Sequence, residues 1–185
     1  ERYQFLTAQK DDLTNAKKEL ETLIDDMLDI MRNIFITQFT LIESKFQVIF
    51  KELFGGGSAA LKLLDPLDVL ESGIDIIVQP PGKKLDSISL LSGGEKAFTA
   101  IALLFAVLSL KPLPFCIFDE IEAALDEVNV YKFAEYIKSY KDKTQFILVS
   151  HRRGTMENAD ILYGVTMQEK GVSKLISLTM NEVVV

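Results

Sequence analysis

Hydrophobic residues recur at intervals of seven along the first fifty residues of the chain. The positions are Leu13, Leu20, Met27, Ile34, Leu41 and Val48. Neither Pro nor Gly interrupts this segment, and its early part is densely charged. The heptad stripe predicts one long helix over residues 1–54 that forms a coiled-coil arm. The alternative is an isolated amphipathic helix that lies on a core. Because the heptads begin almost at residue 1, we expect this chain to be part of a longer one.

The remaining residues, 55–185, alternate between short apolar runs and turns, beginning with the glycines at 55–57. The pattern predicts strands at 61–64, 74–78, 115–118, 146–149, 161–167 and 173–178, and helices within 90–110 and at 127–139. Strands that are buried on both faces and separated by helices indicate an α/β lobe with a mostly parallel sheet flanked by helices. Ligands in such sheets bind at the carboxyl ends of the strands.

Composition narrows the class of protein. The hydrophobic content of 48% is ample for a packed core. A net charge of −7 argues against a protein that binds nucleic acid over its whole surface. Two basic pairs, Lys83 with Lys84 and Arg152 with Arg153, remain candidates for local contacts with nucleic acid. Cys116 is the single cysteine, so we expect an inert core residue in a reducing cytoplasm. No apolar run reaches the roughly 18 residues of a membrane span, and we expect no membrane segment.

The segment LLSGGEK precedes the longest apolar run and predicts the start of a helix. Ser92 is the natural N-cap, and Glu95 stands at the capping-box spacing. A cap alone leaves Gly93 and Gly94 unexplained. Without side chains there, another molecule can approach the first backbone N–H groups, where the helix dipole favours an anion. The segment is therefore either a plain cap or a phosphate contact.

Acidic residues follow the apolar strand FCIF, and a histidine follows the strand FILV. At a strand end, Asp119 suits a Mg²⁺ shell and Glu120 suits a base that orients water. A helix N-cap with an acidic first turn explains these two acids about as well, and Asp126 is also a candidate cap. His151, the sole histidine, stands at the strand end that corresponds to that of Glu120, although a lone histidine is more often a polar surface or core residue.

The order of these motifs resembles that of the ABC-type ATPases: signature, Walker B, D-loop and switch histidine. With the arm in front, the chain is similar to the carboxyl-terminal half of an SMC head domain. The strings GGGSAALKLLDPLDVLESGIDIIVQPPGKKL and SHRRGTMENADILYGVTMQEKGVSKLISL resemble the bacterial chromosome-segregation SMC, or condensin, ATPases in particular. This resemblance covers essentially the whole chain and implies a P-loop NTPase lobe.

The resemblance assigns a role to each motif. It implies that the signature, Ser92, Gly93, Gly94, Glu95 and Lys96, clasps the γ-phosphate of ATP held by an opposing head. It further implies that Asp119 holds Mg²⁺ through water, Glu120 activates the attacking water, Asp126 lies at the interface between heads, and His151 senses the γ-phosphate. Glu95 departs from the Gln of many signatures, and Phe118 and Glu122 stand where related heads often have Leu and Asp.

One motif is absent: no G-x-x-x-x-G-K-[ST] phosphate loop occurs in the sequence. In the family this loop belongs to the amino-terminal half, so we expect the isolated chain to bind ATP poorly and to be inactive. The implied partners are that half, a second head in a homodimer, a kleisin subunit and DNA, in a nucleoid-associated protein. The hairpin around Lys170 and Gly171 is a candidate kleisin surface.

Other functions remain possible from the sequence. A coiled-coil ATPase of double-strand-break repair shares the signature, the strand-end acids and the arm, and is disfavoured by the longer strings. An ABC transporter subunit would carry its phosphate loop ahead of the signature, where this chain has a heptad helix. As an isolated chain, the protein is also a candidate for a non-catalytic docking module.

Overall fold

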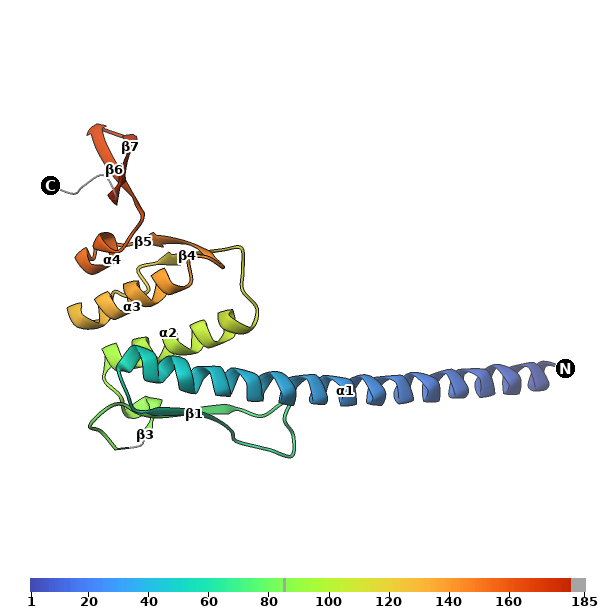
Figure 1. Ribbon diagram of the computed structural model, residues 1–185. Coiled ribbons are helices and arrows are strands. Elements are labelled where there is room, and N and C mark those ends of the chain that lie inside the picture. Colours follow the sequence, from blue (N-terminus) through green and yellow to red (C-terminus); the bar gives the residue numbers. More distant parts are fainter. Residues whose placement is uncertain (85, 181–185) are drawn as a thin grey trace. The chain divides into compact units, whose positions relative to one another are not determined.

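The computed structural model describes residues 1–84 and 86–180 (Figure 1). Its internal contacts define two compact units. Unit 1 comprises Glu1–Leu41 and Lys62–Asp75, and unit 2 comprises Ile42–Leu61 and the described residues from Ile76 onward. Every candidate site residue belongs to unit 2.

The predicted long helix is confirmed as α1 (Arg2–Phe54). Its heptad residues are 45–72% exposed, so the stripe has no partner within the described residues. The helix ends where Gly55, Gly56 and Gly57 adopt positive φ angles of 72°, 141° and 81°. Gly57 also allows a close approach, because a Cβ there would lie 2.2 Å from the Gln79 carbonyl oxygen.

The strands form three separate sheets. The first has the order β1-β2-β3, with β1 at Ser58–Leu63, β2 at Ile74–Gln79 and β3 at Asp86–Ser87. A short 3-10 turn, η1 (Ile88–Leu90), follows β3. Strands β4 (Phe115–Asp119) and β5 (Gln145–Val149) form a parallel pair, whereas β6 (Ile161–Glu169) and β7 (Val172–Thr179) form an antiparallel hairpin.

The expectation of a mostly parallel sheet is therefore wrong for the described residues. Only β4 and β5 are parallel, because α3 (Glu127–Ser139) lies between them in the chain and carries it back to the same end of the sheet. Strands β6 and β7 are joined by a tight turn at Lys170–Gly171, and β2 pairs with β3 across a short loop, so both of these pairs are antiparallel.

The core of unit 2 is rich in aromatic side chains that α2 (Gly93–Leu110) helps to bury. Phe98 of α2 lies 4.9 Å from Phe54, which stacks on Phe50 at 4.1 Å between ring centroids. Further along the helix, fully buried Phe105 contacts a ring of aromatic residues. Its partners are Phe118, Phe133, Tyr136, Tyr140 and Phe146. By length and composition α2 would also suit a membrane span, a test that buried core helices of soluble proteins pass as well.

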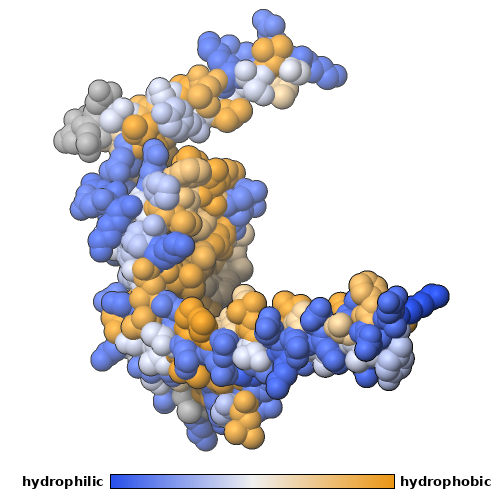
Figure 2. Space-filling model, turned by 90° about the vertical axis from the view of Figure 1, so that its right-hand side faces the viewer, coloured by the Kyte–Doolittle hydropathy of each residue, from blue (hydrophilic) through white to orange (hydrophobic). Residues whose placement is uncertain are grey.

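The β4–β5 sheet has two unlike faces. One face contributes Cys116, buried as expected, and the half-buried Phe118 and Phe146 to the core. The opposite face carries exposed Phe115, Ile117, Ile147 and Val149, so the expectation that these strands are buried on both faces is wrong for this chain. Figure 2 shows a large hydrophobic area (orange) at the height at which Figure 1 draws β4, β5 and α2.

Candidate ATPase half-site

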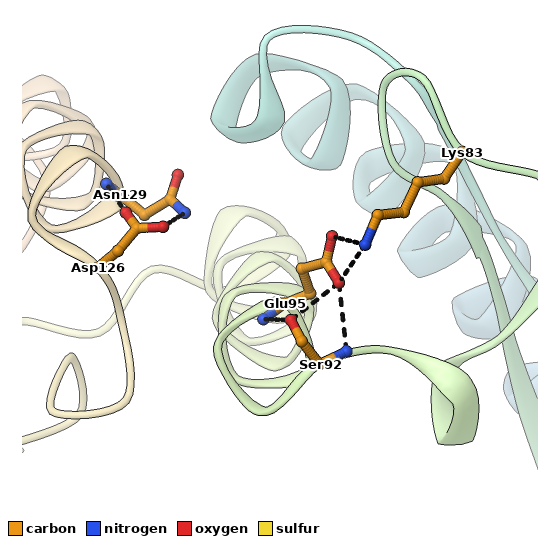
Figure 3. Close-up of polar contacts among 5 residues, drawn as sticks. All are labelled: Lys83, Ser92, Glu95, Asp126 and Asn129. Carbon is orange, nitrogen blue, oxygen red and sulfur yellow. Dashed lines mark hydrogen bonds and ion pairs between the residues drawn. The ribbon is translucent and has the colours of Figure 1, made fainter.

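The signature segment forms a capping box at the start of α2, as predicted (Figure 3). The Ser92 hydroxyl oxygen accepts a hydrogen bond from the Glu95 backbone N–H, at 3.4 Å. In return, Glu95 Oε2 accepts from the Ser92 N–H at 3.2 Å and from the Ser92 hydroxyl at 2.9 Å. The cap is thus present. It uses the hydroxyl hydrogen of Ser92 in a hydrogen bond to Glu95, so that hydrogen is not free to bond to a phosphate.

Lys83 completes this cluster, although the sequence offered it only as a local contact for nucleic acid. Its Nζ lies 2.8 Å from Glu95 Oε1 and 2.9 Å from Oε2. The hydrogen bond from Lys83 lowers the pKa of Glu95, and the bonds from Ser92 lower it further against the opposing effect of burial. The loop before β3 is therefore tied to the first turn of α2 by charge.

The two signature glycines differ in their surroundings. A Cβ added to Gly93 would meet open space, which fits the prediction that another molecule can approach the backbone there. A Cβ on Gly94 would lie 3.0 Å from the Ala124 carbonyl oxygen. Gly94 thus allows the start of α2 to pack against the segment between Glu120 and Asp126. Lys96, in the same first turn, is exposed.

The two strand-end acids lie where the sequence predicted, and they differ in backbone conformation. Asp119 is the last residue of β4, and its exposed side chain has no hydrogen-bond partner among the described residues. Glu120 has a φ of 48°, in the left-handed region that residues other than glycine rarely adopt. Its N–H donates to the Val149 carbonyl at 2.9 Å, so the end of β5 holds this conformation in place. Backbone strain of this kind clusters at functional sites.

His151 meets Glu120 across the two strand ends. Its Nδ1 lies 3.3 Å from Glu120 Oε1, and both side chains are more than half exposed. The parallel register explains the meeting, since Asp119 pairs with Val149 and the next residues leave the sheet side by side. The prediction that Glu120 and His151 occupy neighbouring strand ends is confirmed. Their chemical roles stay predictions.

Asp126 caps α3, which is the alternative that the sequence left open for it. Its Oδ1 accepts from the Asn129 N–H at 2.8 Å, and Oδ2 accepts from the Asn129 side-chain amide at 3.1 Å (Figure 3). A cap leaves the residue exposed, so it does not contradict a place at an interface between heads.

Glu122 is the residue that sequence reasoning missed. Its side chain is 1% exposed, and Oε1 accepts hydrogen bonds from the hydroxyls of Ser150 and Thr155, the latter at 2.9 Å. Oε2 is buried without a partner among the described residues. An acid at the fourth position of the segment DEIEAALD, with hydroxyl residues after the next strand, was the available signal.

The donor set fits a magnesium ion that is shared with a substrate. No cluster of three or more His, Cys, Asp or Glu side chains suited to a metal occurs among the residues that the structure describes. Mg²⁺ is commonly held by one or two carboxylates together with substrate phosphates, rather than by a cage of protein ligands. A single exposed carboxylate such as Asp119 suits that arrangement.

Comparison with solved structures identifies the class of fold. One solved chain comes from a structural study of the ATP-driven dimerization and DNA-stimulated activation of SMC ATPases. It aligns with a TM-score of 0.75 and 43% identity, over 80% of this chain and 90% of that one. The Smc head domain of Pyrococcus furiosus, solved with an extended coiled coil and bound to the C-terminal domain of ScpA, aligns with a TM-score of 0.80 and 40% identity. That match covers 98% of this chain and 45% of the other. The fold is that of an SMC ATPase head.

Sequence comparison identifies the family. Residues 7–174 match the family described as RecF/RecN/SMC N terminal domain, and the chain belongs to this family. The chain is 58% identical over 182 residues to the chromosome partition protein Smc of Bacillus subtilis (strain 168). This match covers 98% of the chain but 15% of the relative, so the chain spans a small part of the length of its curated relative.

Proposed function

We propose that this chain is the carboxyl-terminal half of an SMC ATPase head, which hydrolyses ATP where two heads meet and so drives chromosome condensation and segregation. The observation that carries the proposal is the meeting of Glu120 and His151 at the ends of two parallel strands. A carboxylate there can orient and deprotonate water, and an adjacent imidazole can donate to a phosphate oxygen.

Asp119 and the start of α2 also receive roles in this proposal. Asp119 holds Mg²⁺, which when bound neutralises charge on the phosphates. Gly93 and the exposed N–H groups of the first turn of α2, with Ser92 and Lys96, contact the γ-phosphate bound to the opposite head. The Ser92 hydroxyl must turn away from Glu95 to donate to that phosphate, and Lys83 can then satisfy the freed carboxylate.

Three observations support the assignment to the carboxyl-terminal half. The sequence has no phosphate-loop motif, and its other motifs occur in the order signature, strand-end acids, histidine. The chain covers 45% of a solved Smc chain that comprises the head domain and an extended coiled coil. The apolar face of the β4–β5 sheet is exposed, which suits a surface that the other half covers. The family's description refers to an N terminal domain, and our assignment rests on motif order instead.

The partners of the complete protein follow from the same proposal. A second identical head supplies the nucleotide that the signature contacts, and DNA stimulates turnover, in line with the studied SMC ATPases. A kleisin subunit, comparable to the ScpA whose C-terminal domain is bound to the Pyrococcus head, binds the β6–β7 hairpin through exposed Tyr163, Val165, Leu175 and Ile176. Residues 1–54 form one helix of a coiled-coil arm, and residues 55–185 form the lobe. The protein acts on the nucleoid in the cytoplasm.

ATP titration of the chain with and without the remaining half of the head tests the proposal. We expect no measurable binding at micromolar ATP by calorimetry for the chain alone, because the phosphate loop is missing. Binding and turnover should appear when the other half is co-expressed. Micromolar affinity of the isolated chain, or a complete head without turnover, would contradict the proposal. If the complete head shows no turnover but this chain still binds the kleisin subunit, the result would favour the docking-module function.

A further inference from the structure

We propose that Glu122 is a positioning residue for ATP hydrolysis. Its buried carboxylate fastens the segment that carries Glu120 to the segment that carries His151, and so fixes the geometry between these two groups. The inference rests on the function proposed above, since it concerns the geometry of that site.

Several hydrogen bonds join the two segments. Glu122 Oε1 accepts from the Ser150 hydroxyl, across 28 residues of sequence, and from the Thr155 hydroxyl at 2.9 Å. Ser150 Oγ in turn accepts from the Arg152 N–H at 3.0 Å, and an Arg152 guanidinium nitrogen donates to the Leu125 carbonyl at 2.6 Å. His151 thus lies in a segment whose residues on both sides are bonded to the acidic segment.

The exposed pair itself has little to hold it. Glu120 and His151 are 55% and 66% exposed, and one contact of 3.3 Å between exposed groups contributes little to order. Glu120 also needs support because its φ of 48° is unfavourable for a side-chain-bearing residue. The bond from the Glu120 N–H to the Val149 carbonyl holds one side of this residue, and the buried bonds of Glu122, two residues further on, add support in a region from which water is excluded.

Stability alone does not explain a buried glutamate at this position. One of its two oxygens, Oε2, has no partner within the described part of the chain, and burying such a group is costly. Replacing a buried polar cluster with apolar residues of similar size is often neutral or stabilising. A residue that costs stability and joins two candidate catalytic segments is best explained by the geometry that it imposes.

This reasoning separates a positioning role from a structural one in an experiment. In the full-length protein, the triple variant Glu122→Met, Ser150→Ala, Thr155→Val removes the donors and the acceptor together, so no hydroxyl remains unpaired. We expect a melting temperature close to that of the unsubstituted protein. Turnover at saturating ATP should fall by up to about 10²-fold, since small misplacements of catalytic groups have effects of this size. The KM for ATP should change by less than about threefold, because ATP binding depends on other groups.

Two matched variants complete the test. Glu122→Gln keeps the oxygen that accepts from Ser150 and Thr155, so it should retain turnover to within about threefold. Glu135→Gln makes the same change on the exposed surface of α3 and should be without effect. A purely structural role predicts that turnover per folded molecule stays constant in all three variants, and a triple variant with turnover within twofold of normal would overturn the proposal.

Hydrogen exchange gives a readout that does not depend on catalysis. Without nucleotide, the triple variant should lose protection in peptides covering 119–126 and 149–156 but keep it in α2, and Glu122→Gln should keep it in both regions. Unchanged exchange in 119–126 and 149–156 would overturn the proposal even if the triple variant is too unstable for kinetics. Glu120→Gln in the same preparation tests the underlying function. If this variant turns over ATP normally, the proposed function fails. If Glu120→Gln loses turnover while the triple variant keeps normal turnover, only the proposed role of Glu122 is contradicted.

Discussion

Single residues in this chain serve both local structure and the candidate chemistry. Ser92 and Asp126 are helix caps by their hydrogen bonds, and both are exposed at the surface where the proposed function needs them. Glu120 differs from them, because its side chain caps no helix, its backbone is left-handed and its carboxylate contacts His151. Of the candidate catalytic residues, Glu120 is therefore the one whose local structure is hardest to explain without a function.

Glu120→Gln in the complete head should nearly stop hydrolysis while ATP binding and ATP-dependent dimerisation persist or increase. The amide keeps the size and hydrogen-bonding capacity of the side chain but lacks the charge that orients and deprotonates water, an effect worth about 10²–10⁴ in rate. Steady-state turnover and light scattering measure the two outcomes.

Asp119→Asn provides the comparison for that variant. As a magnesium ligand, Asp119 should be needed for nucleotide binding itself, so this variant should bind ATP weakly. If both acids only start the turn before α3, the two substitutions would be mild and alike. Normal hydrolysis by Glu120→Gln would remove its catalytic role.

At the scale of elements, the loop between β2 and β3 is fastened to the signature helix. The Lys83 N–H donates to the Pro80 carbonyl at 3.1 Å, and its carbonyl accepts from the Gln79 side chain at 3.0 Å. The loop backbone is thereby held in a turn that directs Lys83 towards Glu95 (Figure 3). On its other side, the start of α2 packs through Gly94 against the segment after β4.

Lys83→Met should destabilise the chain by about 0.2–1 kcal/mol at neutral pH, and the difference should vanish in acid. The folded-state pKa of Glu95 is lowered, chiefly by its hydrogen bond from Lys83. A lowered carboxyl pKa contributes stability that is present above the unfolded-state pKa and is lost as the pH falls through the folded-state pKa. Urea unfolding at a series of pH values measures this difference.

Lys84→Met is the matched control, because the neighbouring lysine has no ion pair among the described residues. It should change stability little at any pH. A Lys83→Met effect that persists unchanged below the pKa of Glu95, or that Lys84→Met reproduces, would rule out the ion pair as its cause. High salt should reduce the effect at neutral pH.

At the scale of the whole molecule, the chain exposes apolar surfaces that other polypeptides are suited to cover. The heptad stripe of α1 lacks a partner helix among the described residues, and in unit 2 one face of the β4–β5 sheet is bare. A folded monomer rarely exposes large contiguous apolar patches without a binding function. These surfaces fit a chain that covers 45% of a solved Smc head domain with its extended coiled coil.

Ser92→Arg should block ATP-dependent dimerisation of complete heads, because the larger side chain fills the space where a phosphate of the opposite head would lie. ATP binding to each head should persist. Multi-angle light scattering with and without ATP measures the dimer, and calorimetry measures the binding. A plain cap predicts instead only a loss of about 1 kcal/mol in stability.

Ser92→Asp distinguishes the two explanations more sharply. Aspartate can accept from the Glu95 N–H as serine does, and Lys83 lies close enough to offset part of the repulsion between the two carboxylates, so the loss of stability should stay within about 1 kcal/mol. The charge of the aspartate should repel the phosphate and prevent dimerisation. Dimerisation by Ser92→Asp at the normal ATP concentration would show that Ser92 serves only as a cap.

The sequence by itself determined the elements and their local ends. Heptad spacing predicted α1, the Ser92 and Glu95 spacing predicted the capping box, and the apolar runs predicted β4 and β5 to within one residue at each end. These features depend on residues within a turn or two of each other, so a linear pattern records them. The parallel pairing of β4 with β5 was also predictable, because a helix separates them in the chain.

Apart from the neighbouring strand ends of Glu120 and His151, only the tertiary structure decided which distant groups meet. Lys83 reaches Glu95 across 12 residues, Glu122 reaches Ser150 across 28, and Gly94 packs against Ala124. Sheet membership was also decided there, since the mostly parallel sheet inferred from the strand pattern is replaced by three small sheets. Contacts of this kind depend on how packing routes the chain through space, and the periodicity of a strand or helix records which of its faces is apolar but not what that face will touch.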